Sequence, residues 1–171
     1  MKIELENCPG SLKENFTTYS PVVLKKMFNG KKVSPFLNYS TPTNRKDQSR
    51  FNQNQTHISI SGFQEKYSLI LDGNALRLTN ENESGHYILK PISDLPKNSE
   101  LAPANEHLTM QIAKQIFKIE TAENALVFFE DGSPAYLTKR FDYDENGNKL
   151  AVEDFASLLG KSPATDGEQY K

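Results

Sequence analysis

The stretch that most constrains the fold is Ile58–Pro91, where apolar and polar residues alternate and turn signals recur. Ile58 and Ile60 alternate with serines, and a period of two is typical of a half-buried strand. Gly62 follows as a turn residue, and Lys66–Leu71 then predicts a returning strand. This segment therefore predicts paired strands at the start of a sheet.

Further strands and one long helix follow. Asp72-Gly73-Asn74 is a hairpin signal, and Pro91 would end a strand because proline cannot donate to a ladder. A helix is predicted from about Pro103 to Ile119. Its apolar stripes would be Met110, Ala113 and Phe117 beside Glu106, and Leu108, Ile112 and Ile116. The remaining strands are Ala75–Leu78, Tyr87–Lys90, Ala125–Glu130 and Ala135–Phe141, with a short helix near 152–159. Antiparallel strands with one main packing helix indicate an α+β fold.

Residues 1–57 differ in composition from residues 58–171. Ser20-Pro21 predicts the start of a short helix that Gly30 would end. Residues 40–56 are polar, with one aromatic and almost no aliphatic side chain, which is typical of a mobile linker. We therefore expect an N-terminal extension and linker over 1–57 and the main domain over 58–171.

Composition excludes several classes of protein. The chain has 20 Lys and Arg against 22 Asp and Glu, a net charge of −2, so direct nucleic-acid binding is not expected. One cysteine, Cys8, excludes an intramolecular disulfide. No stretch has the length and apolarity of a membrane span or an export signal. We expect a cytoplasmic protein without membrane contact.

Three features together indicate a site for nucleotide phosphates. The glycine at position 62 would let backbone N–H groups approach a phosphate, although one glycine between strands is more often a hairpin. Lys90 ends a strand with Ile88 on the same face, or is simply a solvated strand end. Glu106 could pair with a cation, or only favour the N-terminal turn of its helix. A strand lysine followed by a helix glutamate is the kinase arrangement for gripping phosphates.

The combination resembles the HipA family, the serine/threonine-kinase toxins of bacterial toxin–antitoxin modules. The matching runs are ISISGFQEKYSLIL, YILKP, PANEHLTMQIAKQ, LTKRFDY and EDFASLLG. The resemblance implies a protein-kinase-like N-terminal lobe that binds ATP, with a hinge at about 138–142. It implies these ATP-binding residues, of which the last three form the adenine hinge with main-chain groups more than side chains: Ser61, Gly62, Phe63, Gln64, Glu65, Lys66, Lys90, Lys139, Arg140 and Phe141.

The resemblance also implies regulation by phosphorylation. Ser59 matches a loop serine that is autophosphorylated in a family member, and Ser61 is a second candidate. A phosphate adds roughly −1.5 to −2 charges where ATP phosphates should lie, so it would eject the loop. Both serines could equally be ordinary exposed strand residues.

The family's larger lobe supplies an aspartate base and the Mg²⁺ ligands, and neither is found in this sequence. We therefore expect a fragment that is inactive alone and holds no metal or catalytic residue. Family partners would be a helix-turn-helix antitoxin that carries the DNA contact and an unknown protein target. The rival hypothesis is a non-catalytic kinase-like interaction or regulatory module.

A calcium loop is a minor alternative. Asp142, Asp144, Asn146-Gly147 and Glu153 fit the spacing of such a loop. However, the preceding segment predicts a strand rather than a helix, and no paired loop exists, so a solvated acidic turn is favoured. The three histidines, His57, His86 and His107, lack ligand spacing and are expected to be structural or solvated.

Overall fold

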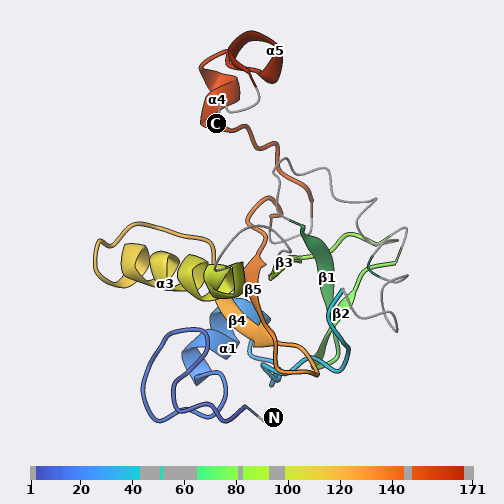
Figure 1. The fold of residues 1–171 in the computed structure, drawn as a ribbon, viewed down its shortest axis with the longest axis vertical. Coiled ribbons are helices and arrows are strands. Elements are labelled where there is room, and N and C mark those ends of the chain that lie inside the picture. The colour runs from blue at the N-terminus through green and yellow to red at the C-terminus, as the bar shows by residue number, and fades with distance from the viewer. Residues whose placement is uncertain are drawn as a thin grey trace. The chain divides into compact units, whose positions relative to one another are not determined.

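The computed structural model describes residues 3–42, 51, 65–80, 83–92, 99–144 and 148–167. The chain divides into two compact units, Met1–Arg140 and Phe141–Lys171. In the described part of the first unit, five antiparallel strands form one sheet in the order β2-β1-β3-β5-β4. Helix α3 packs along β4 and β5 (Figure 1), which makes the fold α+β.

The strands follow the predicted segments closely. They are β1 (Tyr67–Asp72), β2 (Ala75–Leu78), β3 (Tyr87–Pro91), β4 (Asn124–Phe128) and β5 (Pro134–Lys139). The hairpin at Asp72 is confirmed, because Asp72 pairs with Ala75 around Gly73 at a φ of 58°. Pro91 is the last residue of β3 and lies opposite Ala135. The predicted strand around Ile58 and Ile60 lies outside the described residues.

Strand pairing assigns the side chains to two faces of the sheet. Directly opposite residues share a face, so Leu89 and its partner Leu137 lie on one face, where both are fully buried. Lys90 and its partner Tyr136 lie on the other face, because successive side chains alternate. Ile88 shares that second face and is only half-buried. The sheet thus has a closed core face and a more open face that carries Lys90.

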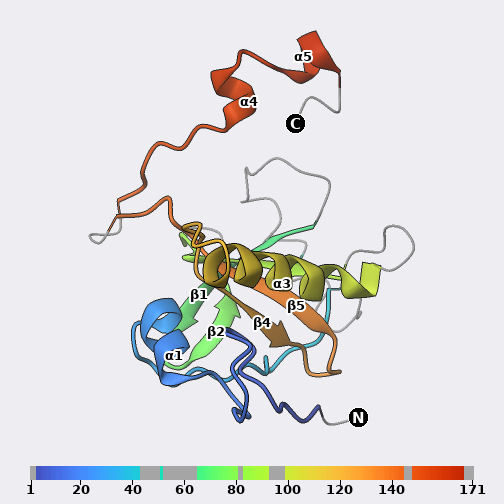
Figure 2. The same ribbon diagram turned by 90° about the vertical axis from the view of Figure 1, so that its left-hand side faces the viewer.

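The N-terminal segment, residues 3–42, covers the core face. Helix α1 (Pro21–Phe28) begins at Ser20, whose side chain accepts a hydrogen bond from Val23 N, and ends at Asn29 in the left-handed conformation. Fully buried Phe28 stacks between Tyr19 and Tyr87, with ring centroids 5.1 and 5.8 Å away. The Tyr87 hydroxyl also donates to Met27 O at 2.8 Å, which joins the end of α1 (Figure 2) to β3. Residues predicted as an extension therefore share one core with the sheet.

Residues 9 and 35–37 of the same segment border the outer edge of β4. Pro9 O accepts a hydrogen bond from Leu126 N at 2.8 Å, and Pro35 O accepts one from Phe128 N at 2.8 Å. An unpaired strand edge invites pairing with other chains. These contacts occupy backbone groups of β4 that would otherwise be open.

Within the predicted linker, residues 40–56, the structure describes residues 40–42 and Phe51. Phe51 is fully buried and packs edge-on against Tyr67, with ring centroids 4.7 Å apart. The aromatic side chain in this polar stretch is thus a core residue. Residues 43–50 and 52–56 lie outside the described part, so the mobile-linker prediction is not tested there.

Helix α3 spans Ala102–Gln115, after a short 3₁₀ turn, η1 (Ser99–Leu101). The prediction that it continues to Ile119 was wrong, and so was the prediction of its buried face. Its buried side chains are Pro103, His107 and Gln111. The expected apolar residues Leu108, Ile112, Ile116 and Phe117 are 38 to 68% exposed. Two of the three buried side chains of the helix are thus polar.

The second unit contains two short helices, α4 (Phe155–Leu158) and α5 (Pro163–Asp166). The Asp154 side chain caps α4 by accepting a hydrogen bond from Ser157 N at 2.8 Å. The predicted helix near 152–159 is therefore confirmed in a shorter form. Across the described residues of both units, no helix combines the length and apolarity needed to cross a membrane.

Candidate functional site

The central feature of the open sheet face is an ion pair between Lys90 and Glu106. Lys90 Nζ, from β3, lies 2.5 Å from Glu106 Oε1, from α3. Both side chains are partly buried, at 25% and 30% exposure. A pair in this intermediate environment is less screened than a fully exposed one and keeps access to a ligand.

Tyr136 borders the pair from β5. Lys90 Nζ lies 5.4 Å from the centroid of the Tyr136 ring, within cation–π range. Burial raises the pKa of the Tyr136 hydroxyl, and the negative charge of Glu106 raises that pKa further. The hydroxyl therefore stays protonated. Lys90 is held between a carboxylate and an aromatic face, with its amine at a fixed place above β3 and β5.

Local structure explains why these residues meet. Lys90 points to the open face because Leu89 and Pro91, its neighbours in β3, are buried on the core face. Glu106 is the fifth residue of α3, and no acidic residue occupies the first turn of this helix. The alternative that Glu106 only favours the helix N-terminus is therefore not supported. Its partner is the strand lysine.

The predicted phosphate-binding loop is mostly beyond what the structure describes. Ser59, Ser61, Gly62, Phe63 and Gln64 lie outside the described residues, so neither their loop role nor the two phosphorylation sites are tested. Glu65 and Lys66 directly precede β1, and Glu65 Oε2 accepts a hydrogen bond from Tyr67 OH at 3.1 Å. Since β1 pairs with β3, these residues adjoin the strand that carries Lys90.

Of the predicted hinge residues, Lys139 ends β5 and Arg140 follows it. Lys139 N donates to Glu123 O, and Arg140 N donates to His86 O, both at 2.8 Å. Lys139 Nζ donates to Lys26 O and to Asn29 Oδ1, both at 3.2 Å, at the end of α1. Two of the predicted main-chain donors are thus already bonded within the protein.

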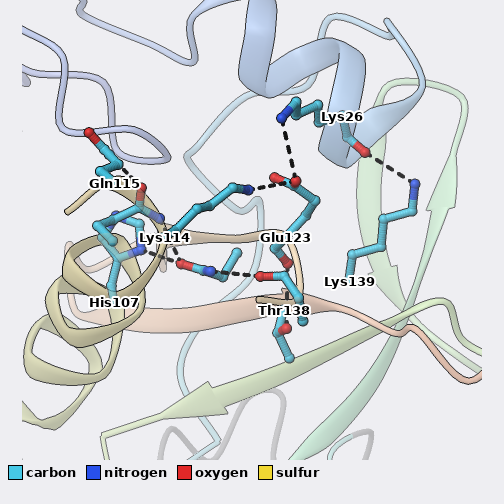
Figure 3. Close-up of polar contacts among 10 residues, drawn as sticks. Lys26, His107, Lys114, Gln115, Glu123, Thr138 and Lys139 are labelled. Carbon is cyan, nitrogen blue, oxygen red and sulfur yellow. Dashed lines mark hydrogen bonds and ion pairs between the residues drawn. The ribbon is translucent and has the colours of Figure 1, made fainter. Parts of the chain in front are cut away.

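Sequence reasoning missed a buried polar cluster behind α3 (Figure 3). Asn124 Oδ1 lies 2.8 Å from His107 Nδ1 and accepts a hydrogen bond from Gln111 Nε2 at 3.0 Å. His107, Gln111 and Asn124 are 1%, 6% and 3% exposed. The signal was the spacing of His107 and Gln111, four residues apart on one helix face. Asn and Gln are mostly exposed in proteins and His is intermediate, so residue type alone did not indicate burial.

Glu123, next to Asn124, joins three elements of the first unit (Figure 3). Its carboxylate oxygen Oε1 lies 2.6 Å from Lys114 Nζ of α3 and 3.9 Å from Lys26 Nζ of α1. Its backbone oxygen accepts hydrogen bonds from Lys139 N at 2.8 Å and from Thr138 Oγ1 at 3.4 Å. The start of β4 therefore anchors α3, α1 and the end of β5 at one place.

His107 should make stability depend on pH. Burial lowers the pKa of His107 below 6.5, and the hydrogen bond to Asn124 offsets part of that effect. The unfolded chain therefore binds the proton more readily than the folded chain. The contribution of neutral His107 to the free energy of unfolding is fully present above about pH 6.5, and it is lost as the pH falls through the folded pKa. We expect urea denaturation to show lower stability at pH 5.5 than at pH 7.5.

Two histidine variants test this assignment. His107→Gln can still donate to Asn124 but cannot titrate, so it should lose much of the decrease between pH 7.5 and 5.5. His86→Gln, at an exposed histidine, should keep the decrease. An equal decrease in wild type and His107→Gln would contradict the assignment.

Among the described residues, no three or more Asp, Glu, His or Cys side chains lie close enough together to hold a metal ion. In the proposed calcium loop, Asp144 Oδ1 accepts a hydrogen bond from Asn148 N at 2.8 Å, and Asp144 Oδ2 accepts one from Asn148 Nδ2 at 3.0 Å. Residues 145–147 lie outside the description. The Asp144 carboxylate is thus used to close the turn.

A groove of about 810 Å³ lies between the N-terminal segment and the outer side of α3. It is lined mainly by apolar side chains, including Leu12, Phe16, Leu108, Ile112 and Ile116. Neither Lys90 nor Glu106 is among the described residues that line it. The groove and the ion pair are therefore separate features.

Comparison with known proteins places the chain in a family. The model of the HipA-like C-terminal domain matches residues 58–171. A protein of Haemophilus influenzae (strain Rd) named "Putative kinase" is 34% identical over 128 residues, which is 69% of this chain and 35% of that protein. The chain thus spans about a third of the relative's length. Since the family match covers well over half of it, the chain belongs to the HipA-like C-terminal domain family.

Proposed function

We propose that the first unit is the ATP-binding small lobe of a HipA-like serine/threonine kinase, with Lys90 contacting the nucleotide phosphates. The observation that carries the proposal is the ion pair between Lys90 Nζ and Glu106 Oε1 at 2.5 Å. In protein kinases, a strand lysine grips the phosphates and pairs with a glutamate on the helix that follows. Lys90 lies on β3, and Glu106 lies on α3, the long helix that follows.

The open face of the sheet is suited to this ligand. A lysine ammonium has three N–H donors, and Glu106 accepts one of them in the described part of the chain. The others could donate to phosphate oxygens. Half-buried Ile88 and Ile70 supply apolar surface on the same face, where an adenine ring could pack. The loop at residues 61–66 would then cover the phosphates.

The remaining steps of the proposal concern the whole protein. Phosphoryl transfer needs a base and Mg²⁺ ligands, which would come from a second lobe. Phosphate on Ser59 or Ser61 would repel ATP from the loop and so silence the enzyme. The family resemblance further suggests a toxin–antitoxin role with a helix-turn-helix antitoxin, and the "Putative kinase" name of the relative supports the reaction class.

Thermal unfolding in the presence of nucleotides tests ATP binding directly. A ligand that binds the folded state raises the unfolding temperature, and the increase grows with the logarithm of the ligand concentration once that concentration exceeds Kd. We expect an increase with ATP that grows with ATP concentration, and a smaller increase with adenosine, because only ATP offers phosphates to Lys90. If neither compound shifts the transition of the folded chain, the alternative of a non-catalytic interaction module is favoured instead.

A further inference from the structure

A continuous chain of hydrogen bonds links the N-terminal segment to His107, the residue that follows Glu106 in α3. It starts at Ser11 O, which accepts a hydrogen bond from Gln115 Nε2 at 3.0 Å. Gln115 Nε2 also donates to Gln111 Oε1 at 2.8 Å, and Gln111 Nε2 donates to Asn124 Oδ1 at 3.0 Å. His107 ends the chain at the same oxygen, and its neighbour in α3 is Glu106.

The direction of every bond in this chain is determined by its ends. A backbone carbonyl only accepts, so Ser11 O requires the Gln115 amide nitrogen as donor. Asn124 Nδ2 donates to a second carbonyl, Ala122 O, at 2.8 Å, which leaves Oδ1 to accept. His107 must therefore donate through Nδ1. Its Nε2 atom is then an acceptor, and it is buried with no hydrogen-bond partner in the described part of the chain.

The two hydrogen bonds that Asn124 Oδ1 accepts, from His107 and Gln111, are buried, and a shift that broke them would leave buried polar groups unpaired, at about 1–3 kcal/mol for each group. The large aliphatic side chains Leu108 and Ile112 of α3 contribute less to holding the helix in place, since they are 46% and 38% exposed. Rotation of α3 that broke the contacts of His107 and Gln111 would also move Glu106 away from β3. The register of the helix and the position of Glu106 are thus set together.

We propose that the chain Ser11–Gln115–Gln111–Asn124–His107 positions Glu106 against Lys90, so that the N-terminal segment controls the ion pair. Ser11 lies outside the residues that match the family, 58–171. This segment is therefore a positioning element of the site and not only a cover for the core. The proposal deepens the proposed function and rests on it for its effect on ATP binding, but the geometric link can be measured without nucleotide.

Lysine labelling measures that link directly. The rate of reductive methylation of Lys90 in the folded chain, read by mass spectrometry, reports how firmly Glu106 holds the amine. Lys139 serves as the reference within the same sample, because its Nζ is bonded to α1 instead. We expect Asn124→Leu and Gln115→Met to raise the Lys90 rate relative to Lys139 by at least about threefold, in line with coupling between contacting residues. Glu106→Gln should raise it at least as much.

Thr109→Val is the matched control on α3. In the described part of the chain, the Thr109 hydroxyl donates to Asn105 O of the same helix and takes no part in the chain from Ser11 to His107. The variant should leave the ratio of Lys90 to Lys139 labelling unchanged. Asn124 is buried, so its variant could fail to fold; Gln115 is exposed, and its variant then decides the question. An unchanged ratio in folded Gln115→Met would overturn the proposal.

The affinity of the variants for ATP gives a second test of the positioning role. Gln115→Met should weaken ATP binding in the wild-type background and have no further effect in the Glu106→Gln background, because it acts through Glu106. Equal effects in both backgrounds would contradict a positioning role. If wild type does not bind ATP while labelling responds as expected, the proposed function fails and the positioning chain stands.

Discussion

Replacing Phe28 by alanine is expected to lower the free energy of unfolding by about 3–5 kcal/mol, the usual cost of removing a buried phenylalanine side chain. Phe28 is fully buried between Tyr19 and Tyr87, although it lies outside the residues that match the family. The loss is comparable with the entire stability of many domains. Chemical denaturation followed by circular dichroism is the suitable measurement, since the chain has no tryptophan.

Val22→Ala is the matched control in the same helix. Val22 is 62% exposed, so its truncation should change stability by no more than about 0.5 kcal/mol. A loss below about 1 kcal/mol for Phe28→Ala would mean that the N-terminal segment is not part of the core. The expected contrast between the two variants isolates burial from any effect on α1 itself.

Replacing Lys90 by methionine is expected to weaken ATP binding roughly 10- to 100-fold, the loss of about 1.5–3 kcal/mol for hydrogen bonds to a charged group. Methionine keeps most of the length of the side chain and removes the ammonium. The variant should remain folded, because the ion pair is partly exposed and contributes little to stability. Calorimetric titration with ATP and Mg²⁺ gives the affinity, and circular dichroism checks the fold.

Lys139→Met is the control for this prediction, because the hinge role expected of Lys139 uses main-chain groups, which the substitution keeps. Lys139 lies beside α1, on the core face with Tyr87, and loses only its contacts with Lys26 O and Asn29. It should leave ATP affinity within about twofold, an effect below about 0.5 kcal/mol. If Lys90→Met binds ATP as wild type does, Lys90 is not the phosphate ligand.

The sequence predicted the sheet well because its signals are local. Asp72-Gly73-Asn74 specifies a hairpin through the backbone freedom of glycine, and the alternation in β1 and β3 records which side chains face the core. The pairing of Lys90 with Glu106 came from the kinase order of strand lysine and helix glutamate, which the family resemblance reinforced. Each of these signals is carried by a few neighbouring residues.

Tertiary contacts determined what the sequence did not predict. The apolar stripe of α3 indicated a buried face, but the structure buries His107 and Gln111 because Asn124 offers them hydrogen bonds. Helical periodicity cannot show a partner on another element. Likewise, the polar composition of residues 40–56 predicted a linker, whereas its single aromatic, Phe51, packs against Tyr67 across the core.

A crystal structure with a non-hydrolysable ATP analogue tests the central claim most directly. A phosphate oxygen is expected within hydrogen-bond distance of Lys90 Nζ, about 2.7–3.2 Å, with Glu106 still paired to the same amine. A bound analogue whose phosphates contact other residues, with Lys90 beyond hydrogen-bond distance, would contradict it.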